Sequence, residues 1–402
     1  MSRFLFVVPP LVGHINPAAG VAAELTRRGH AVAWACTDPR LVRRLAGVDA
    51  VVFPCAGPVP DRDDRVRPPE LRGPEAMKFL WEWFLVPLAE QMAPGVRAAV
   101  EDFGPDAVVA DQQALAGGLV AERLGVPWAT SATTSAEFSD PLAGMPKVAL
   151  WLDGLLRGLR DRIGDPEGSA DPRFSPRLVL AFTIPELAGP APRQGLRIRY
   201  VGPSVADRPT GPDFPWEWLD PARPRVLVTL GTVNAGAGAR FLDVCLAAVR
   251  ERADRLQTVI ADPGRALDGA AGRGDKDVLV LPAVPQLTLL QEVDAVVCHA
   301  GHNTVCEALW HGVPLVVAPI RDDQPVVAGQ VTDAGAAVRV RFGRVTARRL
   351  GAALDTVLRD PGPRAAAARI RTAFRAAGGS EAAATHLERL AGSRLSEDEQ
   401  QP

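Results

Sequence analysis

Residues 278–324 read VLVLPAVPQLTLLQEVDAVVCHAGHNTVCEALWHGVPLVVAPIRDDQ. Three short apolar runs stand out in this stretch, at 278–281, 295–298 and 315–318. Short apolar runs that are rich in Val and Leu are typical of strands that are buried on both faces of a parallel sheet. The stretch therefore predicts consecutive parallel strands, and with them an α/β fold.

A glycine turn and then a helix follow the second run. The turn is His299-Ala300-Gly301-His302, and the helix is expected over 304–311. Asn303 and Thr304, with Glu307 three residues past Thr304, are typical of a helix start. A helix that begins directly after a parallel strand directs backbone N–H groups and the positive end of its dipole outwards, and such a place holds phosphate.

The side chains of this turn offer further contacts to a nucleotide. Gly301 allows a ligand close to the backbone, while His299, Asn303 and Thr304 supply donors. Glu307 suits a ribose diol when a diphosphate sits on the helix end. The same residues also make an ordinary capping box in an ordinary α/β connection, so the pattern alone leaves both interpretations open.

The stretch resembles the nucleotide-sugar signature of the family 1, UDP-glycosyltransferase-like enzymes, which have the GT-B fold. The matching positions run in register from Pro285-Gln286 to Asp323-Gln324 and include His299, Gly301, Asn303, Thr304, Glu307, Gly312 and Pro314. The resemblance implies a donor site for a nucleotide diphospho-sugar, with Asp323 and Gln324 holding the sugar hydroxyls.

One position departs from the family pattern. The family commonly has an aromatic residue where this chain has Ala283, and it stacks on the base. Here the base is expected to rest on the backbone of residues 282–284, which includes Val284. The choice between UDP- and TDP-sugars therefore stays open.

The start of the chain predicts a second ligand-binding turn. A strand at 4–8, a loop at 9–16, a helix that begins at Asn16-Pro17 and a strand at 31–35 form a βαβ unit of a doubly wound sheet. The loop contains Gly13 and His14 and resembles the family's Gly-His-x-Asn-Pro-like turn. The resemblance implies that His14 is the catalytic base and that Gly13 contacts the donor.

Asp111 follows a predicted strand at 106–110 and precedes a predicted helix at 114–124. It matches the family's aspartate that orients the catalytic histidine and stabilises its charged form. An aspartate in this place is equally suited to capping the helix that follows.

The second half of the chain repeats the opening of the first. A strand at 225–229, the turn Leu230-Gly231-Thr232 and a helix over 239–252 follow a proline-rich stretch. Thr232 resembles the family's small hydroxyl residue that faces the diphosphate.

These halves predict an α/β protein of GT-B type, with two Rossmann-like, doubly wound parallel-sheet domains facing a central cleft. The predicted parts are an acceptor-binding domain over 1–205, a linker over 206–224, a nucleotide-sugar domain over 225–380, and a C-terminal helix and tail over 381–402 that crosses back to the first domain.

Bulky apolar residues in the first half are candidates for an acceptor site. They are Trp81, Phe84, Met145 and Trp151. Clustered aromatic residues and apolar helix stripes belong to the core as readily as to a binding surface, so both interpretations stand.

Composition narrows the class of protein. The 402 residues carry a net charge of −2, so no nucleic acid or anionic membrane is expected as a partner. The five cysteines have no metal-ligand or redox spacing, which fits a reducing compartment. The N-terminus is interpreted as a strand rather than a signal peptide, so we expect a cytoplasmic protein, as monomer or homodimer, without metal or cofactor.

The sequence thus predicts an inverting, metal-independent glycosyltransferase that moves a sugar to a hydroxyl of a small, largely apolar natural product by His-assisted displacement. Polyketides, macrolides and aromatic aglycones are the acceptors considered. Three alternatives stay open: a nucleotide-sugar 2-epimerase of GT-B fold, a carotenoid or lipid glycosyltransferase, and an inactive nucleotide-binding partner of another transferase.

Overall fold

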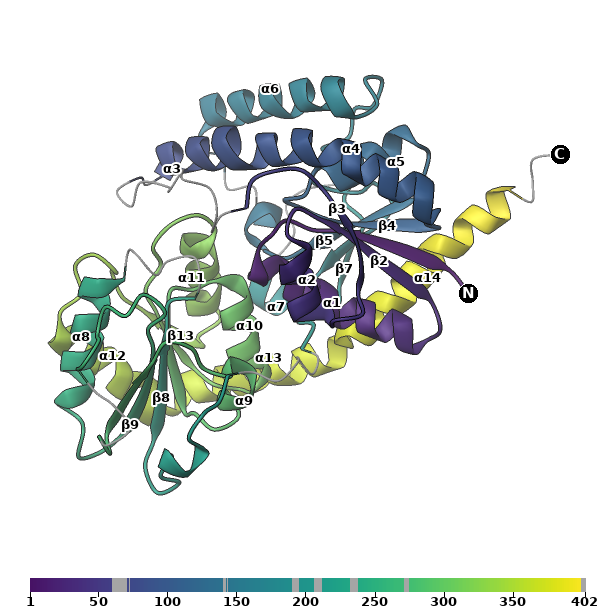
Figure 1. Cartoon of the computed structure of the whole chain (residues 1–402). Coiled ribbons are helices and arrows are strands. Elements are labelled where there is room, and N and C mark those ends of the chain that lie inside the picture. Colours follow the sequence, from purple (N-terminus) through teal and green to yellow (C-terminus); the bar gives the residue numbers. More distant parts are fainter. Residues whose placement is uncertain are drawn as a thin grey trace. The chain divides into compact units, whose positions relative to one another are not determined.

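The computed structural model of the protein describes residues 1–59, 71, 73–139, 142, 144–189, 195–205, 212–231, 238–270 and 275–398. The chain forms two compact units (Figure 1). Unit 1 comprises Met1–Pro185, Pro190–Pro209 and Ala377–Pro402, and unit 2 comprises Glu186–Gly189 and Thr210–Ala376. Each unit is built around a parallel sheet of its own.

The sheet of unit 1 has the strand order β3-β2-β1-β4-β5-β6-β7. Its strands are β1 (Arg3–Val7), β2 (Ala31–Cys36), β3 (Val51–Pro54), β4 (Ala107–Asp111), β5 (Trp128–Ala132), β6 (Val179–Ala181) and β7 (Ile198–Tyr200). Along β1, Phe4 and Phe6 pack on one face while Leu5 and Val7 pack on the other, and all four are buried. Burial on both faces explains the uninterrupted apolar sequence of the strands.

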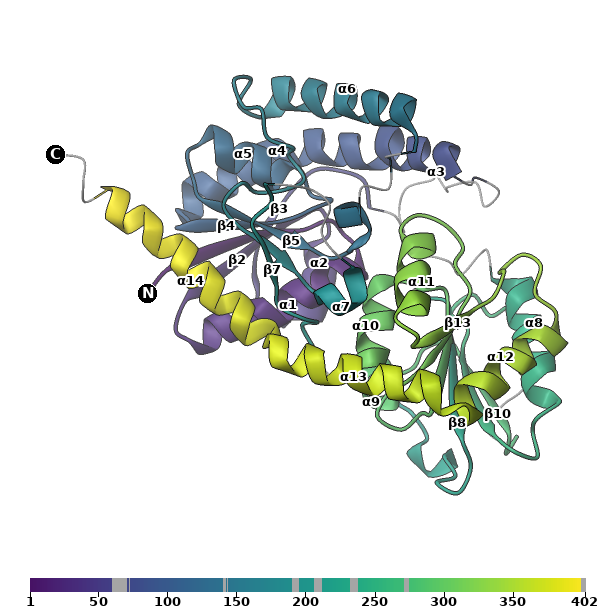
Figure 2. The same ribbon diagram turned by 180° about the vertical axis from the view of Figure 1, so that it is seen from behind.

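Helices cover both faces of this sheet. Helices α1, α2 and α14 contribute to the core on the Phe4 side, and α4 and α5 contribute to the core on the Leu5 side. Figures 1 and 2 show α6 lying along α4, and α14 running beside α1. The helical elements of unit 1 are α1 (Val12–Arg27), α2 (Pro39–Ala46), α3 (Gly73–Leu80), the π-helical η1 (Trp81–Leu85), α4 (Val86–Phe103), α5 (Ala116–Arg123), the 3₁₀-helical η2 (Ala136–Ser139), α6 (Pro146–Ile163) and α14 (Gly379–Asp398).

The predicted start of the first helix is wrong. Helix α1 begins at Val12 after an extended Leu11, and Pro17 lies inside it rather than at its first position. A proline there loses one intrahelical hydrogen bond. Ile15, Pro17 and Ala18 are all buried, and this packing favours the longer helix over a loop. As a result His14 lies in the first helical turn.

The sheet of unit 2 has the order β10-β9-β8-β11-β12-β13. Its strands are β8 (Arg225–Thr229), β9 (Gln257–Ala261), β10 (Val278–Leu281), β11 (Ala295–Cys298), β12 (Leu315–Val317) and β13 (Ala337–Arg339). The parallel strands predicted from residues 278–281, 295–298 and 315–318 are confirmed.

Helices α8 and α12 pack on one face of this second sheet. The helical elements of unit 2 are the 3₁₀-helical η3 (Trp216–Trp218), α8 (Ala239–Arg250), α9 (Gln286–Leu289), α10 (His302–Trp310), α11 (Gln324–Asp333), α12 (Ala347–Arg359) and α13 (Pro361–Ala377), while the short α7 (Pro185–Ala188) falls at the first change from unit 1 to unit 2.

The described part of the proline-rich stretch, residues 212–224, packs within unit 2. The indole Nε1 of Trp218 donates to the carbonyl of Asp275 at 2.6 Å, and the backbone N–H of Asp220 donates to Gln257 Oε1 at 2.7 Å. Residues 206–211 of the predicted linker lie outside the described residues.

The last helix, α14, belongs to unit 1. Arg28, the C-cap residue of α1, contacts Glu388 of α14 at 2.9 Å, and the hydroxyls of Ser204 and Ser380 are 2.8 Å apart. Across the described residues, no helix combines the length and apolar character needed to cross a bilayer.

Candidate active site

Each sheet has a point where the direction of strand order reverses, between β1 and β4 in unit 1 and between β8 and β11 in unit 2. Doubly wound sheets bind ligands at the carboxyl ends of the two strands that flank such a point. In unit 1 these ends are followed by His14, which lies on α1 after β1, and by Asp111, the last residue of β4.

His14 and Asp111 are in direct contact. The imidazole Nδ1 lies 2.9 Å from Asp111 Oδ1 and 3.0 Å from Oδ2. Asp111 is buried, and its Oδ1 also accepts the backbone N–H of Gln113 at 2.8 Å. Since a carboxylate only accepts, the Nδ1 of His14 carries the proton, and Nε2 is the basic nitrogen of the neutral ring.

Thr133 completes this cluster, and the sequence analysis did not identify it. Its hydroxyl lies 2.9 Å from His14 Nδ1 and donates to Asp111 Oδ2 at 3.2 Å. Thr133 follows the end of β5, which pairs with β4. A polar residue just past the strand next to Asp111 is the signal that identifies it, but only once the strand order is known.

In unit 2 the corresponding place holds His299, which directly follows β11. Its ring lies against two glycine backbones. A Cβ on Gly231 would approach His299 Cε1 to 2.9 Å, and a Cβ on Gly301 would overlap the ring outright. Gly231 also has a φ of 69°, which favours glycine. These two positions need glycine because the imidazole fills the space of a side chain.

The turn that holds His299 has a strained backbone. Ala300 is fully buried and has a φ of 64°, a left-handed conformation that costs a residue with a Cβ about 1–2 kcal/mol. This conformation reverses the chain between β11 and α10, so that the first turn of α10 begins directly beside His299.

Burial lowers the pKa of His299 from 6.5 to about 4, and the nearby carbonyl of Thr229 opposes this effect. His299 is therefore neutral near pH 7, with one of its two ring nitrogens protonated. Its Nδ1 has no hydrogen-bond partner among the described residues. A buried, neutral imidazole beside a helix start is suited to contact an anion.

The predicted capping box at Thr304 and Glu307 is wrong. Helix α10 begins at His302 with an extended Gly301 as its N-cap, and no side chain caps it. Glu307 lies in the second helical turn, where its Oε2 accepts the amide N–H of Gln286 at 2.6 Å. The glycine is favoured as the N-cap because His299 excludes a side chain at that position.

Asp323 and Gln324 lie at the start of α11, and Asp323 is its N-cap residue. Oε1 of Gln324 accepts the backbone N–H groups of Ile320 at 2.9 Å and Arg321 at 3.2 Å. The side-chain oxygen therefore holds the loop, and the –NH₂ group is the end that can donate to another partner.

The remaining donor candidates lie around these turns. Gly13 is exposed in the first turn of α1, Asn303 is half-buried and Thr304 is buried in the first turn of α10, and Val284 is half-buried just before α9. Thr232 lies outside the described residues.

The four acceptor candidates lie in different environments. Trp81 is buried in a cluster formed by α3, η1, α4, α5 and α6, and Phe84 and Trp151 pack partly buried against it. Trp151 Nε1 donates to Glu82 Oε1 at 3.2 Å, whereas Met145 is exposed. Trp81 thus has the surroundings of a core residue. In the described chain, no group of three His, Cys, Asp or Glu side chains is arranged to hold a metal ion.

The chain has two Rossmann-like units, each with a histidine near its switch point, and this arrangement of two doubly wound sheets is that of the GT-B fold. The solved structure of the glycotransferase of kitacinnamycin superimposes with a TM-score of 0.76 and is 27% identical, covering 97% of this chain and 98% of that one.

The family follows from sequence comparison. Residues 267–372 match the family model "UDP-glucoronosyl and UDP-glucosyl transferase". The chain is 33% identical to 4'-demethylrebeccamycin synthase of Lentzea aerocolonigenes, over 93% of this chain and 96% of the relative. It is 30% identical to demethyllactenocin mycarosyltransferase of Streptomyces fradiae, over 97% of this chain and 87% of that relative. The chain belongs to this family and is a glycosyltransferase.

Proposed function

We propose that this enzyme transfers a sugar, with inversion at the anomeric carbon, from a UDP- or TDP-sugar to a hydroxyl of a small, largely apolar natural product. The observation that carries the proposal is the contact of His14 Nδ1 with both oxygens of buried Asp111, at 2.9 and 3.0 Å. It fixes the tautomer in which Nε2 accepts a proton.

In the proposed reaction the acceptor hydroxyl gives its proton to His14 Nε2 while its oxygen attacks the anomeric carbon. The bond from that carbon to the diphosphate breaks, and the leaving oxygen keeps the electron pair. A single displacement inverts the anomeric configuration. Asp111 stabilises the imidazolium that forms, and a base placed in this way contributes about 100- to 10,000-fold.

The donor is assigned to unit 2. His299 and the backbone N–H groups at the start of α10 stabilise the charge that develops on the diphosphate. Glu307, held by Gln286, accepts from the ribose hydroxyls, and Asp323 and the –NH₂ of Gln324 contact the sugar. These groups meet the diphosphate charge without a metal ion in the proposed scheme.

The acceptor class is proposed from the relatives. Two of them are named for rebeccamycin and lactenocin chemistry, and a structural neighbour is named for kitacinnamycin. The apolar cluster around Trp81 offers bulky side chains at its edge, Phe84 and Trp151, for an acceptor of this kind.

The test uses UDP- and TDP-sugars labelled in the sugar, incubated with a panel of aromatic, macrolide and carotenoid acceptors. Mass spectrometry is expected to find a labelled glycoside, and NMR to find the anomeric configuration opposite to that of the donor. A 2-epimerised donor would support the isomerase instead, and no turnover of any donor would support a nucleotide-binding partner. A glycoside with retained configuration would contradict the single displacement.

A further inference from the structure

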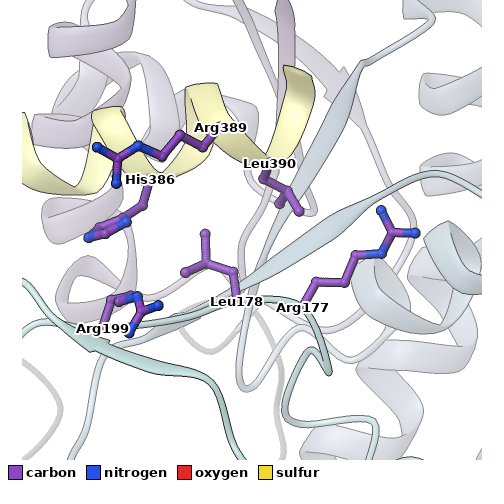
Figure 3. Close-up of a pocket in the computed structure, with 6 residues that line it drawn as sticks. All are labelled: Arg177, Leu178, Arg199, His386, Arg389 and Leu390. Carbon is purple, nitrogen blue, oxygen red and sulfur yellow. The ribbon is translucent and has the colours of Figure 1, made fainter. Parts of the chain in front are cut away.

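A pocket of about 490 Å³ lies in unit 1, where α14 passes the strands β6 and β7 (Figure 3). The six residues that line it are Arg177, Leu178, Arg199, His386, Arg389 and Leu390. Three of these residues are arginines and one is a histidine, and none is acidic. The pocket therefore concentrates positive charge in a protein whose net charge is −2.

The sequence pattern explains why these cations meet. Along β7, Ile198 and Tyr200 pack against Phe138 and Phe174 on one face, so Arg199 between them faces the side covered by α14. On α14 the buried stripe runs through Leu387 and Leu390. His386 and Arg389, three residues apart, flank this stripe on one side of the helix.

Figure 3 shows the side chains of Arg199, His386 and Arg389 gathered on one side of Leu178, while Arg177 extends to the other side. Leu178 and Leu390 are buried and form an apolar floor. The pocket thus offers cationic donors at its rim and carbon surface beneath them.

Two of the three arginines, Arg199 and Arg389, keep their charge unpaired within the described part of the chain. Arg199 and Arg389 have no hydrogen bond or ion pair there. Glu388, the residue before Arg389, instead contacts Arg28 and His30, which lie in the connection between α1 and β2. Burial and the charges of Arg199 and Arg389 lower the pKa of His386, as expected when like charges are held together.

This pocket is separate from the His14 cluster. Leu178 directly precedes the first residue of β6, so it marks the amino-terminal edge of the sheet. His14 and Asp111 lie at the carboxyl ends of the strands, which is the opposite edge. A ligand in the pocket is therefore neither donor nor acceptor of the transfer reaction.

We propose that this pocket binds a small organic phosphate, with the phosphate held by Arg199, Arg389 and His386 and its carbon body on Leu178 and Leu390. Planar guanidinium groups match phosphate oxygens with paired N–H donors. The volume is that of a small-molecule site and exceeds the needs of a bare phosphate ion. The proposal stands on unit 1 alone and does not depend on the transfer reaction.

The experiment is calorimetric titration of the full chain with phenyl phosphate and, separately, with inorganic phosphate. Phenyl phosphate is expected to bind more tightly, because it also covers the apolar floor. In the double variant R199Q/R389Q its dissociation constant is expected to rise at least about tenfold. The double variant R43Q/R44Q, which removes the same charge from exposed arginines of α2, is the matched control and keeps the wild-type affinity.

Three results would overturn the proposal: no binding of phenyl phosphate below about 10 mM, equal affinity of R199Q/R389Q and wild type, or equal losses in the two double variants. Phenyl phosphate could also bind in unit 2, at His299 and the start of α10. Such binding would survive in R199Q/R389Q, so the double variant distinguishes it from binding in the pocket. Thermal unfolding of both variants shows whether a loss of binding reflects loss of the fold.

Discussion

The two units can be compared at the switch point of each sheet, just past the last paired residues of β1 and β4 in unit 1 and of β8 and β11 in unit 2. The side chains at these two places differ. In unit 1 the last register pair of β1 and β4 is Val7 with Ala110, and Asp111 follows. In unit 2 the last pair of β8 and β11 is Thr229 with Cys298, and His299 follows. Asp111 and His299 therefore occupy equivalent places in the two folds.

Their surroundings differ as much as their chemistry. Asp111 accepts from His14, Thr133 and the backbone of Gln113, so its charge is satisfied by donors. His299 lies between two glycine backbones and is kept neutral by burial. The same topological position thus holds a carboxylate that contacts an imidazole in one unit and a buried neutral imidazole in the other. The fold determines where the residue lies, and the residue type determines what chemistry is available there.

The largest effect is expected from H14A in unit 1. Loss of the base should lower turnover about 100- to 10,000-fold, while the donor dissociation constant stays unchanged because unit 2 is intact. Steady-state kinetics and calorimetry with UDP measure the two quantities. An equal loss of donor affinity would contradict the proposal that unit 1 supplies the base while unit 2 binds the donor.

A large effect is also expected from G301A in unit 2. The added Cβ displaces the His299 ring, and loss of one preorganised donor lowers turnover about 100- to 1,000-fold. G329A is the matched control, because a Cβ at Gly329 on α11 meets nothing within 4 Å. Full activity of G301A would argue against a role for His299.

Stability should depend on pH through His299. The unfolded chain protonates this residue below pH about 6.5, whereas the folded chain keeps it neutral down to about pH 4. The unfolded state therefore binds more protons between these values, and stability falls as pH decreases through this window, by up to about 3 kcal/mol.

Urea unfolding of wild type and H299Q between pH 7 and pH 4 measures this term. The wild type is expected to lose more stability than H299Q over that range. His311 and His386, whose pKa values are also lowered, remain in both proteins and cancel in the difference. Parallel curves for the two proteins would mean that His299 is not buried as a neutral group.

A smaller effect, on binding only, is expected from E307Q. The carboxylate is proposed to accept from the ribose hydroxyls, so removing its charge should weaken donor binding about 10- to 100-fold. E292Q changes an exposed glutamate of the same unit and serves as the control. An unchanged dissociation constant in calorimetry would remove Glu307 from the donor site.

The smallest effect is expected from T133V in unit 1. It removes a hydroxyl that contacts both His14 and Asp111, at about 0.5–1.5 kcal/mol per hydrogen bond, so turnover should fall severalfold. T133S is expected to restore it, while KM for the acceptor stays constant in both. If T133S is as impaired as T133V, the methyl packing rather than the hydroxyl matters.

Much of this molecule was predictable from sequence. The parallel strands of unit 2 are confirmed, as is membership of the glycosyltransferase family, because buried strands and a glycine turn leave a local pattern. His14 and Asp111 were paired through resemblance, and the structure places them in contact, although their catalytic roles stay predictions. The helix starts at Val12 and His302 were missed, because local capping rules do not include tertiary packing.

By itself the sequence determined the order of strands and helices, since apolar periodicity and turn residues act over a few neighbouring positions. Only the tertiary structure decided that Thr133 joins His14, that two glycines enclose His299, and that Arg199 meets Arg389 across 190 positions of chain (389 − 199). These contacts depend on which strands become neighbours in the sheet and on where the last helix packs. Strand order and helix placement depend on how the apolar residues of the whole core are buried together. No single stretch of sequence is therefore enough to predict them.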